Sequence, residues 1–178
     1  MNCWKSLNII KEYGSKRLIF YSVIFAFAFF NCFYLTYSIL FPLTLTQAIT
    51  WYAIIALLFL VVPVHQLMHC IPLWVSGKKV GLSLSMFILP PRKSFSSSKP
   101  LQRNLFILSV LFPFSFITIA SLIGAFLYPE YMYGFSMFAA LNAGISTVDF
   151  LYVMSVRKAP RHAYIENHTD GLNILLSR

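Results

Sequence analysis

Residues 61–79, VVPVHQLMHCIPLWVSGKK, decide the fold, because a long apolar run here acquires two histidines just before it reaches a basic segment. His65 and His69 are four residues apart, so a helix would place both imidazoles on one face. A His-x-x-x-His pair binds zinc in this arrangement. In the hydrolytic form of the motif, the residue after the first histidine is a glutamate that serves as general base. In this chain that residue is Gln66.

The composition indicates a membrane protein. Hydrophobic residues make up 58% of the chain and charged residues only 11%, which leaves too few polar side chains to cover a water-facing surface. The net charge of +9 does not indicate nucleic acid, because the basic residues flank apolar runs as topology signals do. We expect the lipid bilayer as a partner and no nucleic acid.

Four apolar runs are long enough to cross a bilayer, so the sequence predicts an all-α, polytopic membrane protein. The second span contains Pro63 and Pro72, which each remove a backbone donor and predict a kink or a break. The spans cover residues 18–41, 48–76 and, as a hairpin of two helices, 104–156. The remaining segments are an N-terminal segment at 1–17, a basic loop at 77–103 and a tail at 157–178.

The basic residues predict the orientation. All 14 Lys and Arg residues lie in three places: four before the first span, six between the second and third spans, and four after the fourth. Cytoplasmic segments of membrane proteins carry an excess of Lys and Arg. We therefore predict that both termini and the 77–103 loop are cytoplasmic.

Asp149 is the one acid, of five in the chain, that lies inside a predicted span. A carboxylate inside a membrane costs several kcal/mol unless it has a partner, so such an acid is a candidate functional residue. His65 lies 17 residues beyond position 48, and Asp149 lies 18 residues beyond position 131. At about 1.5 Å per residue, both are roughly 25–27 Å from the outer ends of their spans. With His69 they form a candidate zinc site that leaves a fourth position open.

Two polar residues share the helical face of Asp149, namely Asn142 and Ser146. They are either donors that orient the metal ligands or polar residues that pack helices together. The histidine pair itself also fits interfacial histidines near the end of an apolar helix. Cys70 points about 100° away from His69 around the helix, so we interpret it as a structural thiol.

Two blocks of the sequence resemble a family of bacterial membrane proteins described as "putative zincin" proteins, which are distantly similar to site-2 proteases. The blocks are residues 61–79 and NAGISTVDFLYVMSVRKAPRHAYIENHTDG at 142–171, and the likeness covers 58–171. The resemblance implies that His65 and His69 bind zinc, that Asp149 is the third ligand and that Gln66 occupies the place of the catalytic glutamate. It also implies a multi-pass protein of the bacterial inner membrane.

Gln66 shapes the expected function, because an amide has no proton to exchange near neutral pH. Loss of a general base lowers a rate by about 10²- to 10⁴-fold. We therefore expect a zincin-like membrane protein that is catalytically impaired or inactive and binds a membrane protein or peptide. One alternative is an active intramembrane zinc peptidase whose base is another group, such as a tail histidine. A second is a small transporter or proton relay built on the two histidines and Asp149.

Overall fold

The computed structural model describes residues 2–41, 50–78, 80–81, 96–97, 100–168 and 171–176. Four long helices dominate the part of the chain that it describes, and each is long and apolar enough to cross a membrane. The protein is therefore mostly helical and multi-pass, as predicted. The helices are α2 (Ser15–Leu40), α3 (Trp51–Val75), α4 (Arg103–Leu127) and α5 (Met132–Arg157).

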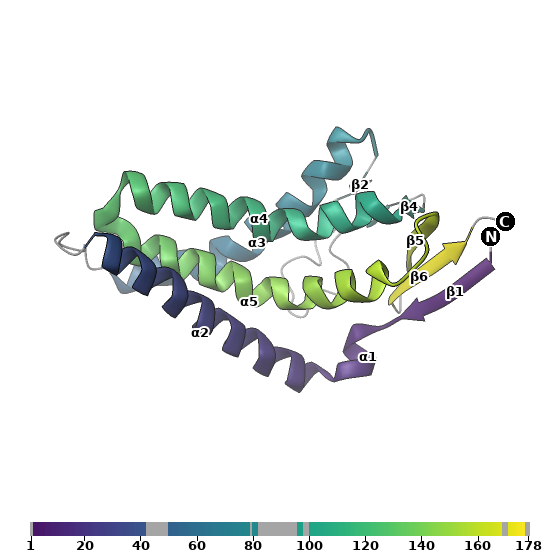
Figure 1. Cartoon of the computed structure of the whole chain (residues 1–178), viewed down its shortest axis with the longest axis horizontal. Coiled ribbons are helices and arrows are strands. Elements are labelled where there is room, and N and C mark those ends of the chain that lie inside the picture. Colours follow the sequence, from purple (N-terminus) through teal and green to yellow (C-terminus); the bar gives the residue numbers. More distant parts are fainter. Residues whose placement is uncertain are drawn as a thin grey trace.

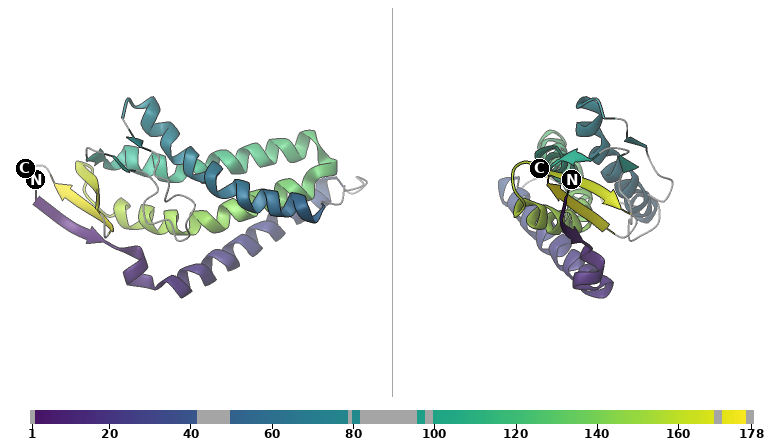
Figure 2. Two further views of the ribbon diagram at one scale, coloured as in Figure 1. Left: turned by 180° about the vertical axis from the view of Figure 1, so that it is seen from behind. Right: turned by 90° about the vertical axis from the view of Figure 1, so that its right-hand side faces the viewer.

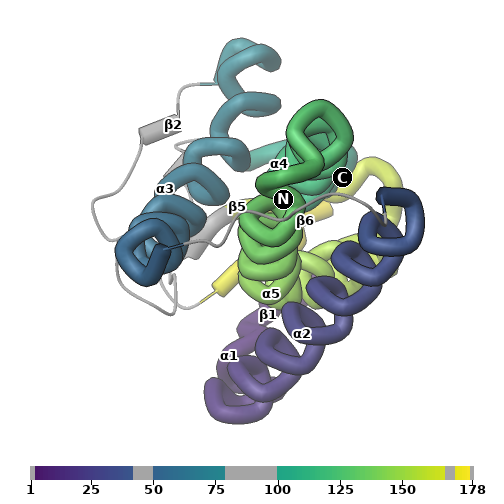
Figure 3. Tube along the Cα trace, turned by 90° about the vertical axis from the view of Figure 1, so that its left-hand side faces the viewer, coloured from purple at the N-terminus to yellow at the C-terminus, as the bar shows by residue number. Residues whose placement is uncertain are grey.

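Helix α5 lies at the centre of the bundle (Figures 1 and 3) and packs against α2, α4 and α3. The short 3-10 helix η2 (Pro129–Tyr131) joins α4 to α5, so these two helices are antiparallel neighbours. Helix α2 approaches α5 closely at Gly144, where an added Cβ would lie 3.0 Å from the Ala26 Cβ and 3.1 Å from the Ser22 carbonyl oxygen. This close contact fixes α5, which carries Asp149.

Helix α3 is continuous through Pro63 and Pro72, so the expected disturbance is a bend and not a break. Figure 2 shows α3 curving away from the bundle toward its C-terminal end. A proline has no N–H to donate to the preceding turn, which allows such a bend. The buried side chains of α3 begin near its middle and continue toward its C-terminal end: Val61, His65, Gln66, His69, Cys70, Pro72 and Leu73.

A four-stranded antiparallel sheet lies at one end of the bundle, beside both chain termini (Figure 1). The prediction of an all-α chain is therefore wrong for this end of the molecule. The first strand pairs with the last, and no local sequence pattern reveals a pairing between residues so far apart. In sheet order, the strands are β1 (Asn2–Leu7), β6 (Gly171–Leu176), β5 (Ala163–His168) and β4 (Leu101–Gln102).

The sheet and the helix ends share one hydrophobic core. Leu7 of β1 and Ile174 of β6 are completely buried, together with Leu73 of α3 and Val156 of α5. Apolar burial of this kind is the main stabilising contribution in a folded domain. The core therefore attaches the sheet to the ends of α3 and α5 that lie nearest to the two histidines and Asp149.

The two terminal segments gain structure that the sequence did not predict. The N-terminal segment 1–17 holds β1 and the short helix α1 (Ile9–Tyr13), and the tail 157–178 holds β5 and β6. Most of the predicted loop 77–103 lies outside the described residues. Within it, β2 (Val80–Gly81) pairs with β3 (Ser96–Ser97). That β1, β4 and the tail strands meet in one sheet agrees with one shared compartment, and which compartment it is stays a prediction.

Candidate metal centre

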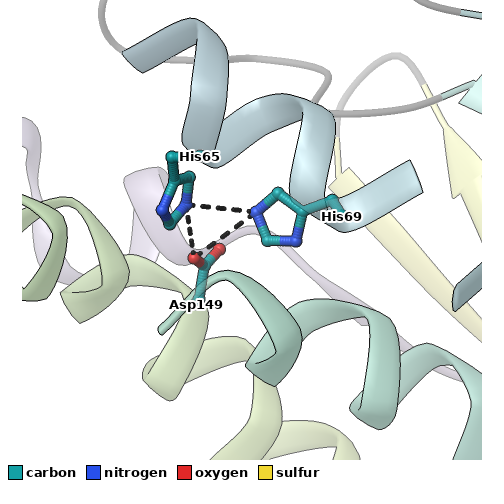
Figure 4. A group of neighbouring side chains, drawn as sticks. All are labelled: His65, His69 and Asp149. Carbon is teal, nitrogen blue, oxygen red and sulfur yellow. Dashed lines mark hydrogen bonds and ion pairs between the residues drawn. The ribbon is translucent and has the colours of Figure 1, made fainter. Parts of the chain in front are cut away.

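Two helices bring three potential metal ligands together (Figure 4). Helix α3 supplies His65 and His69 on one face, and α5 supplies Asp149. The Nε2 atoms of the two histidines are 3.2 Å apart. The Asp149 Oδ2 atom lies 3.1 Å from the Nε2 of His65 and 3.6 Å from that of His69. The residues that the depth comparison placed at one level therefore converge on one point.

The spacing of these three atoms fits a tetrahedral zinc ion. Ligand atoms about 2.0–2.1 Å from such an ion lie about 3.3 Å from one another. The three separations of 3.1, 3.2 and 3.6 Å bracket this value. The donor set of two imidazoles and one carboxylate is also one that zinc prefers. Both histidines are only 1% exposed and Asp149 is 15% exposed, so the carboxylate forms the more open side of the triad.

Asn142 of α5 determines which nitrogen of His65 faces the triad. The Asn142 Nδ2 donates to the Pro113 carbonyl oxygen at 3.4 Å, which leaves the Asn142 Oδ1 as an acceptor. The His65 Nδ1 lies 2.8 Å from that oxygen and must donate to it. A neutral imidazole protonated at Nδ1 has its lone pair on Nε2. His65 therefore presents a lone pair to the other two residues of the triad.

The same rule applies to His69 through a residue that the sequence did not single out. The His69 Nδ1 lies 3.0 Å from the backbone carbonyl oxygen of Ser109 in α4, which can only accept. The His69 Nε2 thus also presents its lone pair. Two nitrogen lone pairs and a carboxylate at these distances repel one another unless a cation or a proton lies between them. This arrangement agrees with a cation site.

Gln66 is the remaining polar residue of the motif, and it is 1% exposed. Gln66 is the residue after His65, so its side chain lies about 100° from that of His65 around the helix axis. It therefore flanks the face that carries both histidines. Its Oε1 atom is buried without a hydrogen-bond partner among the described residues. An unpaired buried amide oxygen is uncommon in folded proteins, and its partner is typically a water molecule, an ion or another bound group. A ligand bound next to the histidines would be one such partner.

Other candidates from the sequence lie outside the triad. The Ser146 hydroxyl donates to the Asn142 backbone carbonyl at 2.8 Å. Cys70 is a buried free thiol whose Sγ is 3.9 Å from the Gln66 carbonyl oxygen, as expected of a structural cysteine. His162 is exposed in the turn before β5. The side chain of His168 lies outside what the structure describes.

Four apolar helices around a buried cluster of two histidines and a carboxylate define a membrane protein with the geometry of a zinc site. The comparison with protein families gives the particular class. The chain belongs to the family described as "Putative zincin peptidase", which matches residues 58–164. That region contains α4, α5 and all three triad residues, and it leaves α2 outside. Neither the curated proteins nor the solved structures gave a match.

Proposed function

We propose that this chain is a membrane zinc-binding protein that holds the ion with His65, His69 and Asp149. One observation carries the proposal: the three facing atoms are separated by 3.1–3.6 Å, as the ligands of a tetrahedral ion would be, and each imidazole has its other nitrogen occupied by an acceptor. Family membership supports zinc as the ion. Zinc in such a site supplies Lewis-acid chemistry, which polarises a carbonyl and activates water for attack.

We propose further that the protein binds a membrane protein or peptide and cleaves it poorly or not at all. A peptidase of this class needs a carboxylate that takes a proton from water and passes it to the leaving amine. Gln66 cannot do so, because its amide does not titrate near neutral pH. Its Oε1, which has no hydrogen-bond partner among the described residues, can accept from a peptide N–H. The chain thus keeps residues for binding a metal and a peptide, and lacks the base.

The location belongs to the same proposal. The sheet end of the bundle, with both termini, would face the cytoplasm of a bacterium, and the helices would cross its inner membrane. The described basic residues at that end support this side, since cytoplasmic segments carry the excess of Lys and Arg. The triad would then lie in the cytoplasmic half of the bilayer.

Gln66→Glu tests the catalytic part of the proposal. The wild type and the variant are incubated in detergent micelles with a quenched fluorescent library of apolar peptides, with zinc and with a chelator. We expect zinc-dependent cleavage by Gln66→Glu that exceeds the wild-type rate by about 10²- to 10⁴-fold. The double variant Gln66→Glu, His65→Ala is the control and should be inactive. Equal cleavage by the wild type and Gln66→Glu would instead favour an active peptidase with another base.

A further inference from the structure

The contact between His69 and Ser109 rests on a proline in the neighbouring helix. In an α-helix, the carbonyl of residue i accepts from the N–H of residue i+4. The residue four positions after Ser109 is Pro113, which has no N–H. The Ser109 carbonyl oxygen therefore lacks its helical donor, and it accepts instead from the His69 Nδ1 at 3.0 Å.

Ser109 returns a second hydrogen bond to the same residue. Its hydroxyl donates to the His69 backbone carbonyl oxygen at 2.5 Å. Both residues are buried, with 1% of His69 and none of Ser109 exposed. The two bonds join α3 to α4 at the level of the triad. The imidazole ring is thus fixed relative to α4 as well as to its own helix.

Pro113 also supports the opposite side of the site. Its own carbonyl oxygen accepts from the Asn142 Nδ2, which orients the Asn142 Oδ1 toward His65. One turn of α4, from residue 109 to residue 113, therefore supplies the acceptor for His69 and also holds Asn142, the acceptor for His65. The proline lies outside the motif and contributes no ligand atom.

We propose that Pro113 is a positioning residue for the metal site: by leaving the Ser109 carbonyl open, it holds His69 as the Nδ1–H tautomer with its Nε2 lone pair toward the ion. This inference rests on the proposed zinc binding and deepens it. Partners that fix the tautomer of a ligating histidine typically change metal affinity by about 10- to 100-fold. The proline thus has a chemical role beyond bending α4.

The test has one arm that uses zinc and one that does not. In the first, zinc Kd is measured by competition with a chelating dye for the full chain in detergent. Pro113→Ala supplies the missing N–H, which draws the Ser109 carbonyl back along the helix axis. We expect its zinc Kd to rise about 10- to 100-fold. Pro63→Ala is the matched control, because it also adds an N–H to a spanning helix, and the carbonyl it would engage, that of Phe59, accepts from neither ring of the histidine pair.

The second arm measures the tautomer of His69 in the metal-free protein from the ¹⁵N signals of its ring, assigned by their loss in His69→Gln. We expect the Nδ1–H form in the wild type and in Pro63→Ala, and a mixture of forms in Pro113→Ala. Ser109→Ala keeps the carbonyl acceptor and should keep the Nδ1–H form.

The outcomes separate this inference from the proposed function. If the wild type binds no zinc, the proposed function fails, and the tautomer arm still decides the role of Pro113. If Pro113→Ala does not fold, the wild-type tautomer decides: an Nε2–H form overturns the inference. An unchanged zinc Kd together with a pure Nδ1–H form in folded Pro113→Ala would also overturn it.

Discussion

At the scale of single residues, the candidate metal site depends on hydrogen bonds that determine where the imidazole protons lie. His65 donates from Nδ1 to Asn142, and His69 donates from Nδ1 to Ser109, so both Nε2 atoms face Asp149. The acceptors differ in kind, because one is a side-chain amide and the other is a backbone carbonyl. Substituting Asn142 removes the first acceptor, and Pro113→Ala draws the second away, and neither changes a ligand.

Asn142→Leu removes the acceptor for His65 and keeps a similar side-chain volume. We expect a rise in zinc Kd of about 10- to 100-fold, since the imidazole loses the partner that fixes its tautomer. Chelator competition on the purified variant measures this change. Ser146→Ala is the control, because its hydroxyl bonds only the backbone carbonyl of Asn142 among the described contacts. A wild-type Kd in Asn142→Leu would remove Asn142 from the site.

The sequence could predict the side chains of this site more readily than its backbone partners. A lone acid and a histidine pair stand out in apolar helices, because burying them without a function is costly. Asn142 stands out for the same reason. Ser109 does not, because its acceptor is a main-chain oxygen that every residue has. The available signal was Pro113, four residues later, which leaves that oxygen without its helical donor.

At the scale of elements, the position of α5 controls where Asp149 lies. Gly144 is five residues before Asp149 and lets α2 approach closely, with Ala26 and Ser22 opposite. The residue has no side chain to keep the helices apart. A larger residue there would push α2 and α5 apart.

Gly144→Leu should therefore lower the free energy of unfolding by about 1–3 kcal/mol, because the added side chain overpacks the α2–α5 contact. Thermal unfolding in detergent measures the change as a lower midpoint. Ala28→Leu makes a similar increase in size on an exposed position of α2 and should leave the midpoint near that of the wild type. Equal midpoints for all three proteins would show that the close contact contributes little to stability.

The existence of the helices could be predicted because a membrane requires long apolar runs, and four such runs are present. The sheet could not, because β1 and β6 pair residues such as Leu7 and Leu172 across nearly the whole chain. Strands of six residues have weak local signals compared with spans of 25. The continuous path of α3 through two prolines also depends on packing against α4 and α5.

At the scale of the whole molecule, the sheet holds both ends of the chain at one end of the bundle. Gly171 begins β6 with φ 145°, a conformation that L residues rarely adopt, and an added Cβ there would clash with the Leu7 carbonyl oxygen of β1. The pairing of the first and last strands thus requires a glycine at this position.

Gly171→Val should release β1 from β6. Because Lys5 lies within β1, we expect trypsin to cleave after Lys5 faster in this variant than in the wild type. The measurement is limited proteolysis followed by mass spectrometry of the intact chain. Gly77→Val is a control of the same kind, since Gly77 also has a positive φ but meets nothing within 4 Å. Equal cleavage rates after Lys5 in Gly171→Val and the wild type would contradict the role given to Gly171.

The shared end also predicts that reporters behave alike on both termini. A tag after residue 178 and a tag before residue 1 should both be protected in intact bacterial cells or spheroplasts and exposed after lysis, because the basic segments favour the cytoplasm. A reporter that is accessible from outside at either end would reverse the orientation proposed here.

The central claim is that His65, His69 and Asp149 form one zinc site. The most direct measurement is the metal content of the full chain, purified in detergent without added metal, for the wild type and for His65→Ala. The account predicts about one zinc ion per wild-type chain and a near-complete loss in His65→Ala, because two remaining ligands do not hold zinc in a structural or catalytic site. Absence of zinc from the wild type, or equal zinc in both proteins, would contradict it.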